Sequence, residues 1–72
     1  MNYRYSLLIQ WPQEDGLYLV TLPEFATIAM QPCTYGKTYE EAIANAKEAL
    51  SSYLEYCQEE DLVPPSPAIV AA

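Results

Sequence analysis

The run from Thr38 to Leu62 constrains the fold most, because neither glycine nor proline interrupts it. Thr38 stands three residues before Glu41. This is the spacing of a capping box, in which both side chains accept hydrogen bonds from backbone N–H groups at a helix start. Apolar residues then recur at spacings of three and four and predict one stripe: Tyr39, Ala42, Ile43, Ala46, Ala49, Leu50, Tyr53, Leu54 and Cys57. We expect a helix over residues 38–60 that frays at its end, where acidic residues 59–61 crowd the negative pole of the helix dipole.

The first 35 residues predict strands. From Tyr3 to Trp11, residues alternate between two faces, as in a half-buried strand. Pro12 ends this strand because it has no N–H for a ladder, and Asp15 with Gly16 then predicts a tight turn. Leu17 to Leu22 is the second strand, so the two strands form an antiparallel hairpin.

A third, weaker strand is predicted over Ala26 to Gln31. Pro32 limits its pairing, so residues 33–35 either continue the strand beyond a bulge or form a loop. Gly36 supplies a tight reversal before the helix. After the helix, prolines force an extended segment, in which Ala68 to Ala72 either adds a short edge strand or remains loose.

Together these elements predict an α+β domain. It contains a small antiparallel sheet of three to four strands, in the order β-β-β-α-β, with one long helix packed on one face. Seventy-two residues make one domain at most. We therefore expect a single domain over residues 1–72, with strands in 1–35, the helix in 38–60 and a proline-rich tail in 61–72.

Both faces of the second strand are apolar. Leu17 and Leu19 lie on one face, and the other face carries Tyr18, Val20 and Leu22. Since one helix covers only one face of a small sheet, part of the second face needs another molecule. We expect a homo-oligomer, either a dimer or a tetramer.

The charge of the chain is strongly negative. Ten acidic residues stand against three basic ones (Arg4, Lys37 and Lys47), which gives a net charge of −7. Such a surface repels phosphate, so no direct nucleic-acid binding is expected. It favours a basic partner, or it only keeps a small hydrophobic domain soluble; both interpretations stay open. The segment up to Trp11 resembles neither a signal peptide nor a membrane span, so we expect no membrane contact and a cytoplasmic location.

The sequence offers few residues for catalysis. Without histidine, Ser–His and Cys–His catalysis is excluded, and two separate cysteines cannot complete a zinc site. Two glycines cannot build a phosphate loop, and the acidic residues are expected in turns or on the solvent face of the helix. Cys33 could act as a thiol nucleophile beside Lys37, but a half-buried thiol is the better interpretation. We expect no enzyme, no catalytic residue, no cofactor and no metal.

Five residues are candidates for partner binding. Glu41, Glu48 and Glu55 share the acidic side of the helix, where they either contribute to partner capture or are merely solvated. Trp11 and Tyr18 combine a large apolar ring with a polar group, which suits interface contact. A nucleic-acid stacking platform would require a basic groove, which this sequence lacks.

Two segments carry a family pattern: residues 22–25 (Leu-Pro-Glu-Phe) and residues 34–42 (Thr-Tyr-Gly-Lys-Thr-Tyr-Glu-Glu-Ala). With the opening strand and the proline-rich tail, they make the chain similar to the HicB-like antitoxin family over nearly its whole length. The run from Gly36 to Ala42 is the most specific part. Lys37 stands where many relatives have an acidic residue, and the connector over 25–33 is longer than in several of them.

The resemblance implies a β-β-β-α-β domain similar to a cut-down ribonuclease H fold without that enzyme's metal-binding carboxylates. It also implies self-association and neutralisation of a small, basic ribonuclease toxin by protein–protein contact. Members that repress their own promoters carry an additional C-terminal DNA-binding segment, which these 72 residues do not include. The alternative is a stand-alone, self-associating domain without a toxin that binds a small molecule at a subunit interface.

Overall fold

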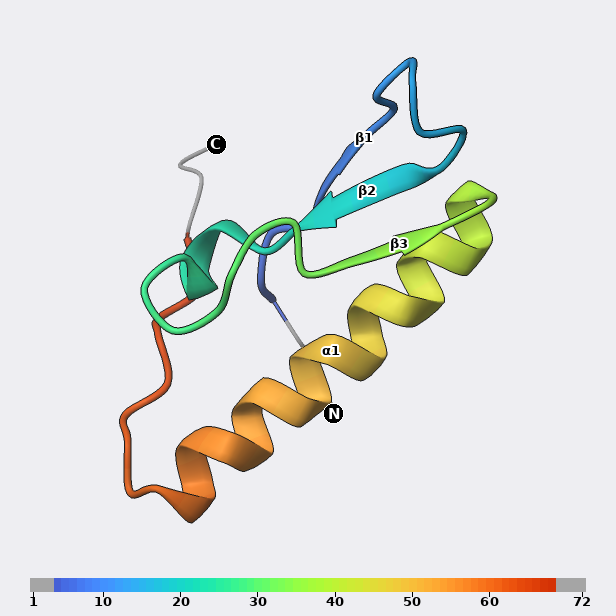
Figure 1. Ribbon diagram of the computed structural model, residues 1–72. Helices are drawn as coiled ribbons and strands as arrows, with labels where there is room; N and C mark the ends of the chain where they lie inside the picture. The colour runs from blue at the N-terminus through green and yellow to red at the C-terminus, as the bar shows by residue number, and fades with distance from the viewer. Residues whose placement is uncertain (1–3, 69–72) are drawn as a thin grey trace.

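The computed structural model describes residues 4–68, in which an antiparallel sheet packs one face on a long helix (Figure 1). The elements are the strands β1 (Leu8–Gln10), β2 (Tyr18–Thr21) and β3 (Thr34–Gly36), the 3-10 helix η1 (Pro23–Phe25) and the helix α1 (Tyr39–Glu59). The predicted α+β class and the three-stranded antiparallel sheet are confirmed. The predicted edge strand at residues 68–72 falls outside the described residues, except for Ala68, which is not in a strand.

The hairpin of β1 and β2 is the predicted one, with shorter strands. Ile9 lies opposite Val20 and Gln10 lies opposite Leu19, so residues on each face follow the expected alternation. The turn between the strands contains Gly16 at a φ of 65°, a left-handed conformation that favours glycine. Within residues 4–68 the pairing of β1 begins at Leu8, and the backbone N–H of Ser6 instead donates to a side chain, the carboxylate of Glu24.

The prediction of the third strand is wrong in its position. Residues 26–31 are not a strand; they follow η1 as a loop whose N–H groups at Ile28 and Ala29 donate to the carbonyl of Phe25. The side chain of Gln31 replaces the expected ladder, since its amide accepts from the N–H of Leu22 at 3.1 Å and donates to the carbonyl of Leu22 at 3.0 Å. The third strand forms after Pro32 instead, where Tyr35 pairs with Leu19.

The start of α1 follows the capping prediction with one change. The hydroxyl of Thr38 accepts from the N–H of Glu41 at 3.1 Å, as expected. The carboxylate of Glu41 accepts from the N–H of Lys37 at 3.1 Å, one residue before the cap position. The helix begins at Tyr39 and ends at Glu59, within one residue of the predicted bounds at each end.

The core lies between the sheet and α1, and Figure 1 shows β3 running beside the N-terminal half of the helix. Six buried residues form it: Val20, Leu22, Phe25, Ala42, Ala46 and Leu50. The buried stripe of α1 is narrower than predicted, because Tyr39 and Ile43 are exposed. The sheet therefore packs on the alanines of α1, and the side chains at the edges of the predicted stripe stay exposed to solvent.

Gly36 is the last residue of β3 and lies buried against the start of α1. Its role is close approach rather than the predicted tight reversal. A Cβ atom placed there would overlap the backbone nitrogen of Ala42 and would lie 2.7 Å from the Cα of Ala42 and 2.8 Å from the carbonyl carbon of Glu41. Only a residue without a side chain lets this strand and the helix meet so closely.

One carboxylate joins the two ends of the described chain. Glu24 accepts from the N–H of Ser6 at 3.0 and 3.1 Å, from the hydroxyl of Ser6 at 3.1 Å and from the N–H of Ala68 at 2.9 Å. The hydroxyl of Tyr5 donates to the carbonyl of Pro65 at 2.8 Å. These contacts hold the segment after α1 against the segment before β1 and against η1, and Figure 1 shows the tail returning from the end of α1 toward η1.

The C-terminal end of α1 is closed by hydrogen bonds despite its acidic residues. The N–H of Leu62 donates to the carbonyl of Cys57 at 2.8 Å, and the N–H of Asp61 donates to that of Gln58 at 3.4 Å. This is a Schellman motif, and it requires a left-handed residue at Asp61, whose φ is 53°. Asp61 combines an unfavourable conformation with a negative charge at the negative end of the helix.

We therefore expect Asp61→Gly to stabilise the domain by about 1 kcal/mol, because glycine adopts the left-handed conformation freely and carries no charge. Thermal unfolding followed by circular dichroism measures the change. Asp61→Ala is the matched control: it removes the charge but keeps a Cβ atom, so it should stabilise less. Equal melting temperatures for the two variants would contradict the conformational part of this prediction.

Within residues 4–68, no helix combines the length and the apolar composition needed to cross a bilayer.

Candidate partner-binding surfaces

Three aromatic rings from separate elements meet at one end of the molecule and form what we call the aromatic ladder: Trp11, Tyr18 and Tyr39. Trp11 follows β1, Tyr18 begins β2 and Tyr39 begins α1. The ring centroids of Trp11 and Tyr18 are 4.8 Å apart, and those of Tyr18 and Tyr39 are 4.3 Å apart. The outer rings are exposed, Trp11 by 52% and Tyr39 by 57%. The structure thus joins the two predicted aromatic candidates and adds Tyr39 to them.

The phenol of Tyr18, the middle ring of the ladder, is uncharged. Burial raises the pKa of the Tyr18 phenol, and the hydroxyl of Tyr39 and the negative charge of Glu40 raise it further. Tyr18 therefore stays protonated and neutral at physiological pH. Glu40 is exposed in the first turn of α1, directly after Tyr39.

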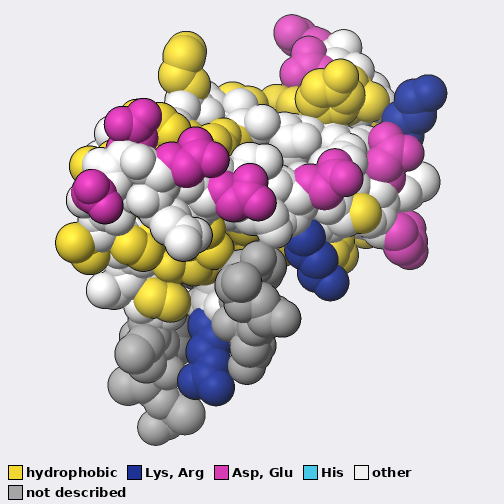
Figure 2. Space-filling model, turned by 90° about the horizontal axis from the view of Figure 1, so that it is seen from below, with side chains coloured by type: hydrophobic (Ala, Val, Ile, Leu, Met, Phe, Trp, Pro, Cys, Tyr) yellow, Lys and Arg dark blue, Asp and Glu magenta, His cyan; other side chains and the backbone are white. Residues whose placement is uncertain are grey.

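The predicted carboxylates Glu41, Glu48 and Glu55 form the acidic helix face. All three are exposed and follow one another at seven-residue intervals, so neighbouring members are about 10 Å apart along the helix axis. Figure 2 shows acidic side chains in a row across the face that α1 forms. Glu41 has a structural role as well, because its carboxylate accepts the hydrogen bond from Lys37 described above. The five predicted residues therefore lie on two surfaces. Trp11 and Tyr18 belong to the aromatic ladder, and the three glutamates form the acidic helix face.

The second sheet face is left open by α1, as its residue pattern predicts. Leu8, Gln10, Leu19, Thr21 and Tyr35 alternate with the helix-facing residues, and we call them the open sheet face. Leu8 is 45% exposed and Tyr35 is 57% exposed. None of the five carries a charge. This face is the surplus apolar surface on which the prediction of self-association depends.

Sequence reasoning does not select Tyr39 or Tyr35 as surface residues. Helical periodicity assigns Tyr39 to the buried stripe. The sequence leaves residues 33–35 open between a strand and a loop, so it does not assign the Tyr35 side chain to a face of the sheet. The position of Tyr39 in the first turn of the helix could have indicated its exposure, because a side chain there can extend past the edge of the sheet.

Cys33 lies against the core and not on a reactive surface. Burial raises the pKa of its thiol, although nearby hydrogen-bond donors act in the opposite direction. The thiol donates to the carbonyl of Val20, with 3.6 Å between sulfur and oxygen. A protonated thiol with a backbone acceptor is a poor nucleophile. Among residues 4–68, no three acidic or cysteine side chains gather closely enough to hold a metal ion.

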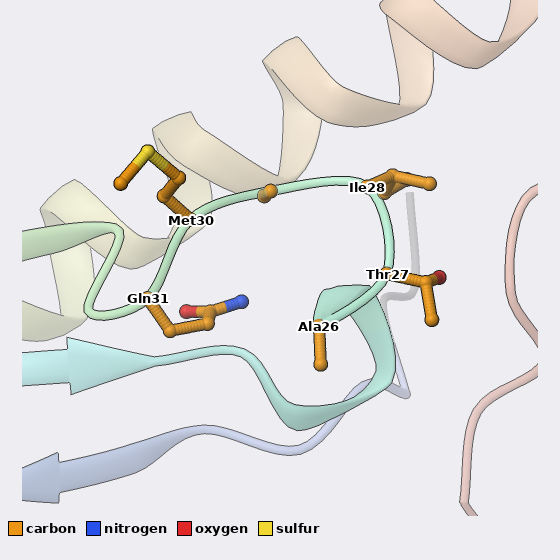
Figure 3. Close-up of a pocket in the computed structure, with 6 residues that line it drawn as sticks. Ala26, Thr27, Ile28, Met30 and Gln31 are labelled. Atoms are coloured by element: carbon orange, nitrogen blue, oxygen red, sulfur yellow. The ribbon is translucent and has the colours of Figure 1, made fainter.

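A shallow hollow of about 500 Å³ lies along the loop of residues 26–31. In Figure 3 the amide of Gln31 points into the loop, whereas the side chains of Ile28 and Met30 point away from it. All the lining residues come from this one loop and none is charged. The amide of Gln31 is already bonded to Leu22, so the hollow offers little that would orient a ligand.

These features define a class: a small acidic α+β domain in which one helix covers one face of a three-stranded antiparallel sheet. The chain is 42% identical over 53 residues to the UPF0150 protein Ta0767 of Thermoplasma acidophilum, a match that covers 72% of this chain and 68% of that relative. The chain belongs to the UPF0150 family. No family model matches the sequence. No solved structure matches it either.

Proposed function

We propose that this chain is a non-catalytic, HicB-like antitoxin domain that acts in the cytoplasm and neutralises a small, basic ribonuclease by protein–protein contact. The observation that carries the proposal is the acidic helix face, an exposed row of carboxylates on a chain with a net charge of −7. A negative field of this kind attracts a basic protein and orients it during encounter.

Two further observations support this function. The sequence resemblance to HicB-like antitoxins implies a small sheet with one helix, and this is the fold observed. The thiol of Cys33 is hydrogen-bonded within the molecule, which agrees with a non-catalytic role. The domain would act by covering the active surface of the ribonuclease.

The direct test uses a small basic protein encoded beside this chain. We expect the two proteins to co-purify, and we expect an equimolar amount of this chain to stop RNA cleavage by the partner. Cleavage that continues at a tenfold excess of this chain would overturn the proposal.

Neutralising the acidic helix face should slow capture of that partner. For Glu48→Gln with Glu55→Gln, we expect the association rate at low salt to fall about fivefold, with little change in the dissociation rate, because exposed charges act mainly on encounter. Glu41 is left unchanged because it caps the helix. Stopped-flow mixing measures the two rates.

The matched control has the same net charge. Two glutamines in place of glutamates change the charge from −7 to −5, and so do two lysines at Ala26 and Thr27 in the exposed loop after η1. If both variants slow association equally, the overall charge acts and the helix face has no special role. If neither variant slows it, electrostatic capture is wrong.

The alternative is a stand-alone, self-associating domain that binds a small molecule at a subunit interface. The open sheet face favours it, because copies of an acidic chain repel each other except where an uncharged apolar surface lets them meet. A monomeric mass by light scattering at micromolar concentration would exclude this second function.

A further inference from the structure

We infer that the aromatic ladder is a binding platform for an arginine side chain of a basic protein partner, with Trp11 and Tyr39 supplying ring faces and Glu40 supplying the counter-charge. This inference rests on the proposed function for the basic character of the partner. It adds the chemical group that is recognised and the place where recognition occurs.

The arrangement of the rings is the first argument. Tyr18 is half-buried between the two outer rings and contacts both of them. Trp11 and Tyr39 are thereby held in position although more than half of each side chain is exposed. Rings that are fixed before binding lose little conformational freedom when a partner arrives. Exposed Trp and Tyr side chains of this kind are enriched among residues that dominate binding energy.

The other aromatic cluster of this protein shows the contrast. Phe25 is fully buried, and its ring centroid lies 4.9 Å from that of Tyr5 and 5.6 Å from that of Tyr53. Those rings fill the core. The outer rings of the ladder leave most of their surface in water, so core packing does not account for their placement.

The charge around the ladder selects a cation. The faces of Trp and Tyr rings carry negative electrostatic potential, and Trp is the best of them for cations. Glu40 is exposed and follows Tyr39 on the first turn of α1. Glu14 and Asp15 are exposed on the turn that follows Trp11. Arginine suits this site better than lysine, because its planar guanidinium can stack on a ring while its N–H groups bond to a carboxylate.

A direct test is available because the chain has a single tryptophan, so intrinsic fluorescence at long wavelength reports on Trp11. The probe is a capped peptide of alternating glycine and arginine, titrated at low salt into the full chain. We expect a saturable change in Trp11 fluorescence. The same peptide with lysine should bind about threefold more weakly, and the uncharged citrulline peptide should not bind measurably. Equal responses to the arginine and citrulline peptides would overturn the inference.

Variants at the ladder separate it from general attraction to an acidic protein. Tyr39→Leu and Glu40→Gln should each weaken peptide binding about three- to fivefold, whereas Tyr39→Phe, which keeps the ring face, should bind as the wild type does. The matched controls are Tyr56→Leu and Glu59→Gln, exposed positions farther along the same helix and outside both the ladder and the acidic helix face, which should leave binding unchanged. Equal weakening by Tyr39→Leu and Tyr56→Leu would exclude the ladder. Thermal melts of each variant confirm that it is folded.

The failure of this inference can be told apart from the failure of the proposed function. If Tyr39→Leu still neutralises the basic ribonuclease with unchanged affinity, the ladder is not the site while the antitoxin role stands. If the wild type binds the arginine peptide as described but no ribonuclease is inhibited, the platform stands and the antitoxin role does not.

Discussion

Replacing Gly36 with alanine is expected to lower the free energy of unfolding by about 3 kcal/mol. The added methyl group would overlap backbone atoms of Ala42 and lie 2.8 Å from the carbonyl carbon of Glu41. Backbone at a capped helix start cannot move aside as a flexible side chain can, so β3 and α1 must separate. A domain of this size has a total stability of roughly 4–11 kcal/mol, so this loss is a large part of it.

Thermal unfolding should show the Gly36→Ala loss as a fall in melting temperature of about 12–24 °C. Gly16→Ala is the control, because Gly16 has a φ of 65° and a Cβ atom added to it would meet no other atom within 4 Å. That substitution should cost only about 1 kcal/mol, from backbone conformation alone. If the two variants melted at the same temperature, the close approach of strand and helix would not be the reason for Gly36.

The second large effect is expected at Glu24. Glu24→Gln should destabilise the domain by about 2 kcal/mol at pH 7, because hydrogen bonds to a charged acceptor contribute more than those to a neutral one. Glutamine would also replace one carboxylate oxygen with an NH2 group. That donor would face the backbone N–H of Ser6 or of Ala68, which now donates to the carboxylate. Urea unfolding measures the change. Glu14→Gln, on the exposed hairpin turn, is the control and should change stability by less than about 0.5 kcal/mol.

The pH dependence of this effect has a definite sign. Burial acts to raise the pKa of the Glu24 carboxyl, but the hydrogen bonds from Ala68 and Ser6 outweigh it and hold the pKa below its ordinary value of 4.5. A lowered pKa means that the ionised carboxyl stabilises the folded state above about pH 4.5, and that this stability is lost as the pH falls through the folded-state pKa. The difference between the wild type and Glu24→Gln should therefore shrink from pH 7 to pH 3. A difference that stays constant over this range would show that the charge of Glu24 contributes nothing.

The helix and the hairpin could be predicted because their signals lie within a few residues of the structures they specify. Thr38 and Glu41 bond to backbone groups three or four positions away, and a proline or glycine acts on its own backbone torsions. The prediction of the third strand over residues 26–31 was wrong because an interaction with a more distant residue decides the conformation of this segment. Alternating apolar residues there were outcompeted by the amide of Gln31, which bonds to Leu22 nine residues earlier.

Of the two candidate surfaces, the acidic helix face could be predicted from local sequence and the complete aromatic ladder could not. Periodicity alone placed Glu48 and Glu55 on one exposed side of the helix, because the helical repeat is fixed by backbone geometry. The ladder required three elements to meet. Trp11 and Tyr18 belong to one hairpin, but Tyr39 reaches Tyr18 only because the fold packs the start of α1 against the sheet.

The sequence by itself determined the acidic charge, the bounds of α1 within one residue, the hairpin and the open apolar sheet face. Each depends on composition or on interactions between near neighbours along the chain. The tertiary structure decided where β3 forms, why residue 36 must be glycine and how Glu24 joins Ser6 to Ala68, which lies 44 residues after Glu24. These depend on which distant segments the packed core brings together, and local preferences do not specify that choice.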